Sequence, residues 1–415
     1  MVFLVVLDQM IVSGSRFLIS IVLAKLLGLE EFGVYVLLWT VVTFAAGMQI
    51  PITITPMMQL GAGVSDRRSG IFFTVSLGFQ LFYHLAAIPF VSAGAIWILW
   101  GRADIWLLTL AVNAYVICYN QYEFFRRFFY TTGQRWRVLF CDIALYLTLA
   151  LAISAFVTNA EVSIVAYLLI SIIPALALCF LVLRSFPKNR VSKIHALAHG
   201  KKMMRIAVPL MISALGSFVS GHTFIYATAL FLGHAEVGGI AAARNLLGPL
   251  IILLMALENG ITRESVQRYL KDPESLQAFL KRVTVMWLTV FFLYVVLTST
   301  FSESILSAIY GEDFRQFHSL VLWFGLASLM QLISRVQAVR LRTVGDYQVI
   351  KAANLTSMWV SLALAMPLVY GLGLSGAMLS LIIQQFIVMF FQILPLRMDS
   401  RLNIFPVGLR REGKT

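Results

Sequence analysis

Between its first two long apolar runs, this 415-residue chain reads Ala24-Lys-Leu-Leu-Gly28-Leu-Glu-Glu31-Phe-Gly33. Between two later apolar runs it reads Ala229-Leu-Phe-Leu-Gly233-His-Ala-Glu236-Val-Gly238. The Gly, Glu and Gly of the second segment follow those of the first at one constant offset of 205 residues. Glycines at such places favour the end of a helix and a tight turn. The repeated segment therefore predicts two similar halves, each with a helical hairpin at the same point.

Apolar stretches long enough to cross a bilayer fill the rest of the chain. Hydrophobic residues make up 60% of the sequence and charged residues only 12%, with a mean hydropathy of +0.87, which excludes a water-soluble globular surface. The runs are too long for the strands of an outer-membrane barrel and lack their alternation. We therefore predict an all-α polytopic membrane protein with about 12 transmembrane helices, near residues 3–27, 33–59, 71–99, 104–125, 138–158, 162–183, 206–231, 238–260, 283–300, 317–341, 347–368 and 374–395.

Basic residues gather in every second loop. Counting from an inside N-terminus, 26 of the 32 lysines and arginines fall in the even-numbered loops and the C-terminal tail. The opposite loops carry mainly acids, such as Glu30, Glu31 and Asp104. The positive-inside rule then predicts that both termini lie in the cytoplasm. The net charge of +13 is thus explained by membrane topology, and we do not expect a nucleic acid as partner.

The repeat predicts how the chain is divided into domains. We expect an N-terminal six-helix bundle at 1–184, a basic cytoplasmic linker at 185–205, a C-terminal six-helix bundle at 206–396 and a cytoplasmic tail at 397–415. Because six is an even number, the two bundles run in the same direction and form a parallel repeat. The Asp272-Pro273 step predicts that residues 262–281 form short surface helices.

Charged residues within the predicted spans are the candidate functional residues, because a charge at membrane depth is costly unless it faces a partner or a water-filled cavity. Arg16 and Arg244 lie deepest, and we predict that they face a central cavity. Five others lie nearer the cytoplasmic ends, where they are candidates for an inner gate or for ion coupling: Asp8, Glu123, Asp142, Glu258 and Arg335. Gly28, Gly33, Gly233 and Gly238 are expected to shape the hairpins. No metal site is expected, since His195 and His199 lack a third ligand nearby.

Several short motifs resemble those of polysaccharide-exporting membrane proteins. Besides the two hairpin segments, they are the Thr-Gly133-Gln-Arg loop, Pro209, Tyr310-Gly-Glu-Asp-Phe314 and Gly371-Leu-Gly-Leu-Ser-Gly376-Ala. The resemblance spans nearly the whole chain and is to the Wzx-type flippases of the multidrug/oligosaccharidyl-lipid/polysaccharide exporter superfamily. It implies a flippase that moves a polyprenyl-diphosphate-linked oligosaccharide, such as an O-antigen, capsule or exopolysaccharide unit, from the inner to the outer leaflet of a bacterial cytoplasmic membrane.

The resemblance also bears on single residues. Related lipid II flippases carry an arginine shortly before a proline in helix 8, and Arg244-Asn-Leu-Leu-Gly-Pro249 is similar to that pattern. Arg16 holds a comparable place in the first span. A guanidinium suits a diphosphate because it donates several hydrogen bonds in a fixed fork. We expect a transporter without a cofactor that acts as a monomer in membrane lipid, with glycan-assembly proteins as candidate partners at the basic cytoplasmic loops.

Two other functions stay open at this point. A cation-coupled multidrug efflux pump of the same superfamily would use an acidic cavity, and Asp8 favours that interpretation while Arg16 and Arg244 oppose it. A membrane glycan polymerase or ligase would act on the same lipid-linked sugars. Such an enzyme needs an acid/base constellation outside the membrane, and the longest outer connection, near residues 301–316, lacks one. We therefore expect a transporter and not an enzyme.

Overall fold

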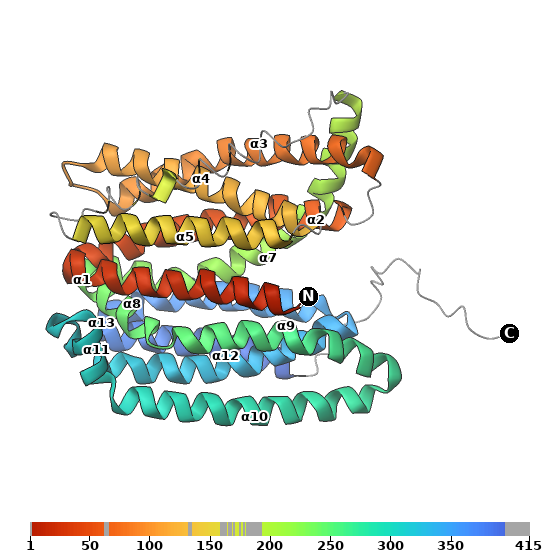
Figure 1. Cartoon of the computed structure of the whole chain (residues 1–415). Helices are drawn as coiled ribbons and strands as arrows, with labels where there is room; N and C mark the ends of the chain where they lie inside the picture. The colour runs from red at the N-terminus through yellow and green to blue at the C-terminus, as the bar shows by residue number, and fades with distance from the viewer. Residues whose placement is uncertain are drawn as a thin grey trace.

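A computed structural model of the chain describes residues 2–61, 66–131, 135–157, 164, 168, 171–173, 176, 179 and 193–394. Every regular element in this part of the chain is helical (Figure 1). The first half contains α1 (Val2–Gln49), the π-helix η1 (Ile50–Ile54), α2 (Thr55–Gly61), α3 (Asp66–Ile98), α4 (Ile105–Thr131) and α5 (Arg135–Val157). The second half contains α7 (Lys193–Phe231), α8 (His234–Asn245), α9 (Gly248–Lys271), α10 (Pro273–Thr300), α11 (Ser302–Tyr310), the 3-10 helix η2 (Glu312–Phe317), α12 (His318–Val344) and α13 (Tyr347–Ile393).

Two of the longest helices each contain two predicted spans. Gly28 interrupts α1 with φ 73° and ψ 176°, and Gly373 interrupts α13 with φ 61° and ψ −137°. A positive φ is readily available only to glycine, so these residues let the chain reverse between consecutive spans. Gly233 has nearly the same conformation as Gly28, with φ 111° and ψ 179°. The repeated sequence motif thus produces the same backbone break in both halves.

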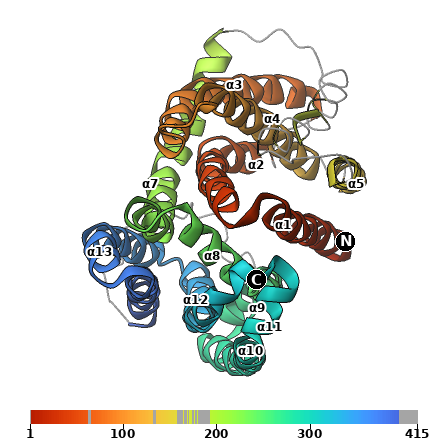
Figure 2. The same cartoon turned by 90° about the vertical axis from the view of Figure 1, so that its left-hand side faces the viewer.

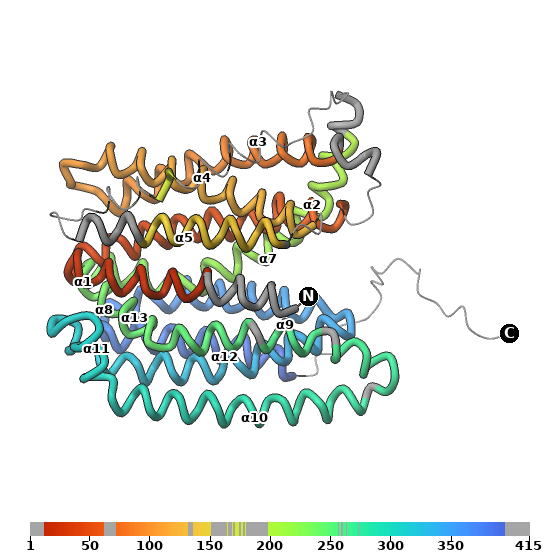
Figure 3. The backbone as a smooth tube through the Cα atoms, viewed as in Figure 1, coloured from red at the N-terminus to blue at the C-terminus, as the bar shows by residue number. Residues whose placement is uncertain are grey.

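The predicted spans can be compared with the helices. By length and apolar composition, five described helices pass as membrane spans, or six if α8 and α9, which meet at 53°, form one broken span. The count treats α13 as a single helix although it bends at Gly373. The sixth predicted span, 162–183, lies mostly outside the described residues. Figure 3 follows the backbone through both halves.

The prediction for residues 262–281 is wrong. Instead of short surface helices, α9 continues to Lys271 and α10 begins at Pro273. Asp272 separates them with an extended backbone, and its carboxylate accepts hydrogen bonds from the backbone N–H groups of Glu274 at 3.1 Å and Ser275 at 3.0 Å. An aspartate cap followed by proline is a strong helix start, so the two long helices meet at one residue.

The helices form two bundles side by side. Figures 1 and 2 show α1 to α5 in one bundle and α8 to α13 in the other, with α7 passing between them. α7 packs on α13 in the second bundle and also contacts η1 in the first. Residues 193–205 of the predicted linker form the start of α7, so the helix begins before the predicted second bundle. The C-terminal tail at 397–415 lies outside the described residues.

The two glycine hairpins meet backbone to backbone, where α1 of the first bundle packs on α8 of the second. A Cβ at Gly33 would lie 1.8 Å from the carbonyl oxygen of His234, and a Cβ at Gly238 would lie 2.4 Å from that of Leu29. Small residues allow such close approach, which is a main source of helix association in membranes. Beside this contact, the Phe32 and Phe314 rings lie 6.1 Å apart. The bundles are therefore closed at this end, which the charge pattern predicts to be the outer end.

Candidate functional site

A cavity of about 700 Å³ lies between the two bundles. Its walls come from α1, η1, α4 and α5 on one side and from α7, α8 and α9 on the other. It extends from Tyr35 and Val237, close to the hairpin contact, to Arg127 and Met255. Arg16 and Arg244 both line it, although 228 residues separate them in the sequence (244 minus 16).

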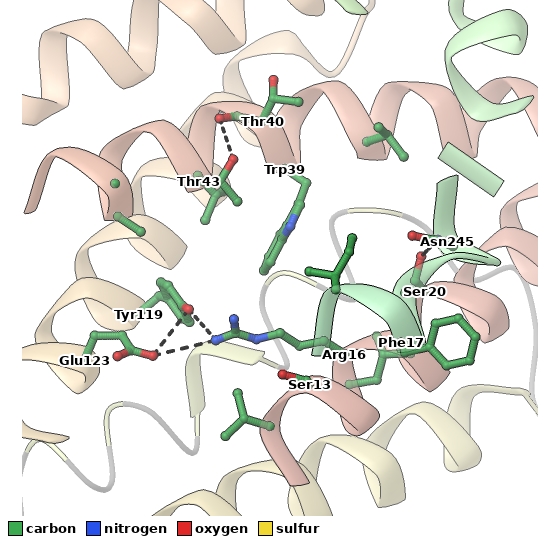
Figure 4. Close-up of a pocket in the computed structure, with 18 of the residues that line it drawn as sticks. Ser13, Arg16, Phe17, Ser20, Trp39, Thr40, Thr43, Tyr119, Glu123 and Asn245 are labelled. Carbon is green, nitrogen blue, oxygen red and sulfur yellow. Dashed lines mark hydrogen bonds and ion pairs between the residues drawn. The ribbon is translucent and has the colours of Figure 1, made fainter. Parts of the chain in front are cut away.

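Arg16 reaches across the cavity wall from α1 to α4 and α5 (Figure 4). Its Nε donates to the Tyr146 hydroxyl at 3.0 Å, and its Nη2 donates to the Tyr119 hydroxyl. The same Nη2 lies 3.6 Å from Glu123 Oε1. The guanidinium also lies over the Tyr119 ring, 5.4 Å from its centroid. Its side chain still has 37% of its surface exposed, so Arg16 is held in place yet open to the cavity.

The acids near Arg16 are surrounded by arginines. Glu123 on α4 lies 3.6 Å from Arg126 Nη1 and 3.9 Å from Arg127 Nε, besides its contact with Arg16. Arg126 Nε also donates to Asp142 Oδ2 on α5 at 2.8 Å, in a pair that is almost completely buried. These contacts neutralise both carboxylates, so Glu123 and Asp142 do not make this wall of the cavity acidic.

Arg244 stands apart from these ion pairs. It lies in the last turn of α8, just before the break at Leu246–Leu247 and the start of α9 with Pro249. Its side chain is exposed in the cavity, and no hydrogen bond or ion pair joins it to another described residue. His222 of α7 lines the same cavity and stacks on Phe218, with ring centroids 4.1 Å apart. Among the described residues, Arg244 is thus a cation on the second-bundle wall of the cavity with no side-chain partner.

The predicted gate residues form two groups, one in each bundle. Glu123 and Asp142 share Arg126 in the first bundle. In the second bundle, Glu258 of α9 accepts from Arg342 at 2.5 Å and from Arg335 at 3.4 Å. Among the described side chains the two groups are separate, because α4 and α5 lie in a different bundle from α9 and α12. A role of these residues in a gate or in ion coupling stays a prediction. Asp8 lies outside the described side chains.

Sequence reasoning missed several residues that the fold brings to the cavity. It placed Arg126 and Arg127 in a cytoplasmic loop, but α4 continues to Thr131 and both are helical. Their spacing of three and four residues from Glu123 was the available signal, since such residues share a helix face. Trp39 also lines the cavity, four residues after Tyr35. In the described part of the chain, no group of three His, Cys, Asp or Glu is placed to hold a metal ion.

The fold is similar to that of several solved transporters. A multidrug resistance MATE-family transporter of the MOP superfamily, in its inward-facing conformation, matches with a TM-score of 0.74 and 11% identity over 92% of each chain. The lipid II flippase MurJ, in an inward closed conformation, matches with a TM-score of 0.68 and 12% identity, covering 94% of this chain and 86% of that chain. A MOP superfamily transporter from Pyrococcus furiosus matches with a TM-score of 0.64, 12% identity and coverage of 94% and 93%.

No family model matches the chain, and no curated protein matches it. The structural similarities establish the fold, which is the two-lobed, all-helical fold of MOP superfamily transporters. The predicted fold class is thus confirmed, and the chain is a multi-pass membrane protein. The solved structures that share this fold include multidrug transporters and a flippase.

Proposed function

We propose that this chain is a flippase that moves a polyprenyl-diphosphate-linked oligosaccharide across a membrane by alternating access. The observation that carries the proposal is Arg244, a cation exposed in the cavity without a partner among the described residues. A charge at membrane depth costs free energy unless an anion or water satisfies it. Phosphate oxygens would satisfy a guanidinium with charge-assisted and bidentate hydrogen bonds.

The charge balance of the cavity supports an anionic substrate. Its described lining contains four arginines and one acid, namely Arg16, Arg126, Arg127, Arg244 and Glu123. A cavity of this sign attracts anions and repels cations. Its volume of about 700 Å³ falls within the usual range of small-molecule sites, about 300–1,000 Å³. A diphosphate and the first sugars fit this space while the lipid tail stays in the bilayer.

The interlocked hairpins support alternating access. The bundles touch through Gly33 and Gly238 at one end, and the cavity lies below that contact. Transporters built from two repeats often bind substrate at the repeat interface and rock one repeat against the other. Separation of the hairpins would open the cavity at the hairpin end, which is closed in this structure. We further propose a bacterial cytoplasmic membrane location with both termini inside, action as a monomer, and glycan-assembly proteins as partners.

The alternative is a cation-coupled multidrug efflux pump, and one observation favours it. Glu123 lines the cavity, and several similar structures are multidrug MATE transporters. A carboxylate that binds a cationic drug must be available to it. Glu123 lies within 4.0 Å of three arginines and its side chain is only 13% exposed. The flippase therefore ranks above the efflux pump.

Leaflet transfer in liposomes tests the proposal. The purified protein is reconstituted with a fluorescent polyprenyl-diphosphate oligosaccharide, and its movement is followed with and without ion gradients. We expect transfer by the wild type and its loss in Arg244→Ala. Arg268→Ala is the matched control, because Arg268 pairs with Glu264 on α9 outside the cavity. If folded wild-type protein transfers no lipid but exports cationic dyes, the efflux pump replaces the flippase.

A further inference from the structure

Four aromatic rings form a continuous wall on the first-bundle side of the cavity. Tyr35 and Trp39 stack with centroids 6.2 Å apart. Trp39 in turn lies 6.1 Å from Tyr115 and 6.4 Å from Tyr119. Tyr115 and Tyr119 are nearly parallel, 5.8 Å apart at 9°. All four residues line the cavity, and they come from α1 and α4.

Two of these rings are accessible from the cavity. Tyr35 and Tyr115 are buried, whereas Trp39 and Tyr119 are only partly buried. Figure 4 shows Trp39 pointing into the pocket above Arg16 and Tyr119. The Tyr119 ring is fixed in place, because its hydroxyl accepts from Arg16 and donates to Glu123 at 3.4 Å. The wall therefore presents two rigid, partly open aromatic surfaces.

The Trp39 indole has an unused hydrogen-bond donor. No hydrogen bond joins its Nε1–H to another described residue. Tryptophan N–H groups usually find a hydrogen-bond partner, and a hydroxyl bound in the cavity would supply one here. Among the described residues nothing accepts from this N–H, so Trp39 combines a partly open ring surface with an available donor at the edge of the cavity. That pair of features suits a ligand with both apolar and hydroxyl surface.

We propose that Trp39 and Tyr119 form a subsite for a sugar ring of the substrate, next to the diphosphate subsite at Arg244. This inference rests on the proposed flippase function and names the part of the substrate that the aromatic wall recognises. A hexopyranose carries C–H groups on one face, which stack on an aromatic ring, and hydroxyls around its edge. The indole N–H and the exposed part of Arg16 are donors for those hydroxyls. The hydroxyls of Thr40 and Thr43 already bond other groups.

The arrangement also divides the two halves of the substrate between the two bundles. Trp39 and Tyr119 belong to the first bundle, and Arg244 belongs to the second. A sugar diphosphate bound in this way bridges the bundles below the closed hairpins. The sugar subsite then adds affinity only for a lipid diphosphate that carries a sugar. Arg244 contributes to the binding of the lipid diphosphate with or without the sugar.

Binding of two lipids by the purified full-length chain separates these contributions. The probes are a polyprenyl diphosphate without sugar and the same lipid diphosphate carrying its oligosaccharide. We expect the wild type to bind the glycosylated lipid about tenfold more tightly, the scale on which a ring stacks on an aromatic side chain. Trp39→Leu should remove that difference and leave the affinity for the bare lipid unchanged. Arg244→Ala should weaken the binding of both lipids.

Conservative and control variants complete the test. Trp39→Phe keeps a ring and should retain part of the sugar increment, which a variant that merely unfolds would not do. Trp97→Leu is the control, because Trp97 contacts Tyr226 and does not line the cavity. If Trp39→Leu weakens the binding of both lipids equally, or of neither, the sugar subsite is wrong. The proposed flippase function is not affected by that result. Wild-type protein that binds neither lipid overturns the proposed function, and the subsite with it.

Discussion

Gly33 of α1 lies so close to the carbonyl oxygen of His234 that a Cβ atom there would come within 1.8 Å of it. The contact joins the two bundles through backbone alone, so no side chain can move aside to relieve a clash. Gly33→Ala must therefore push the hairpins apart, at a cost of about 1–3 kcal/mol in the closed state. We expect the variant to populate the state that is open at this end.

Labelling of a cavity cysteine measures that shift. Ser20 lines the cavity, and the three native cysteines, Cys118, Cys141 and Cys179, are replaced first. Gly33→Ala should make Ser20→Cys react faster with an impermeant thiol reagent added from the hairpin side. Gly14→Ala is the control on the same helix, because a Cβ at Gly14 meets nothing within 4 Å. Equal labelling of both variants would show that the hairpin contact does not seal the cavity.

The buried ion pair between Asp142 and Arg126 predicts a large effect on stability. The carboxylate of Asp142 is 0% exposed and accepts from Arg126, which is 5% exposed. Asp142→Ala leaves the buried guanidinium of Arg126 without its acceptor at 2.8 Å, and breaking a buried ion pair typically costs about 3–5 kcal/mol. Asp142→Ala should therefore lower the thermal unfolding midpoint in detergent by many degrees. Glu264→Gln breaks the exposed pair with Arg268 and should change it little, since such pairs contribute about 0–1 kcal/mol.

A double variant checks that the stability lost in Asp142→Ala comes from the charge that remains on Arg126. Arg126→Met combined with Asp142→Leu replaces the pair by apolar side chains and should recover much of the stability lost in Asp142→Ala. If the double variant is less stable than Asp142→Ala, the two charged side chains stabilise the fold in some way besides neutralising each other. Stability like that of Glu264→Gln in both cases would contradict the burial of the pair.

Much of the fold could be predicted from the sequence because lipid leaves few choices. Long apolar runs must become helices when no water can satisfy the backbone. The matched glycines indicated the repeat, and Gly28 and Gly233 both have a positive φ with ψ near 180°. Arg16 and Arg244 were predicted to share a cavity because a deep charge needs one, and they line the same cavity.

Partners across helices could not be predicted in the same way. Hydropathy places a residue along a helix but does not give its direction around the axis. Arg126 was therefore assigned to a loop, although α4 continues past it and turns it toward Asp142. The candidate gate residues also divide between the two bundles, because Glu258 contacts Arg342 within its own bundle. These contacts depend on how the bundles pack, which no single segment specifies.

An ion-pair cluster at the hairpin end predicts a weak pH dependence of stability. Arg102 donates to Asp104 at 3.0 Å and to Glu31 of α1 at 2.6 Å. The hydrogen bond from Arg102 lowers the pKa of Asp104 below its ordinary value. The ionised Asp104 therefore contributes its full stabilisation above about pH 4, the pKa of aspartate in the unfolded chain. This stabilisation is lost as the pH falls through the lower pKa of the folded state.

Thermal unfolding between neutral and strongly acidic pH measures this effect. Asp104→Asn should be less stable than the wild type above about pH 4, by about 1 kcal/mol or less because the pair is partly exposed. The two proteins should converge as the pH falls through the lowered folded pKa of Asp104, where the wild-type carboxylate becomes protonated. A constant difference at every pH would assign the effect of the substitution to something other than this carboxylate.

Glu123→Gln separates the two candidate functions most directly. In a flippase, Glu123 competes with the substrate for Arg16, which lies 3.6 Å away. Removing its charge releases the guanidinium and makes the cavity one charge more positive, so the anionic lipid should bind more tightly, most clearly at low salt. In a cation-coupled efflux pump, the same carboxylate would hold the drug or the ion, and its loss would abolish transport. Tyr146→Phe removes the hydrogen bond from Arg16 to the Tyr146 hydroxyl, at 3.0 Å, without changing any charge, and is the matched control. Tighter binding of the anionic lipid by Glu123→Gln than by Tyr146→Phe supports the flippase. Loss of drug transport in Glu123→Gln alone would favour the pump.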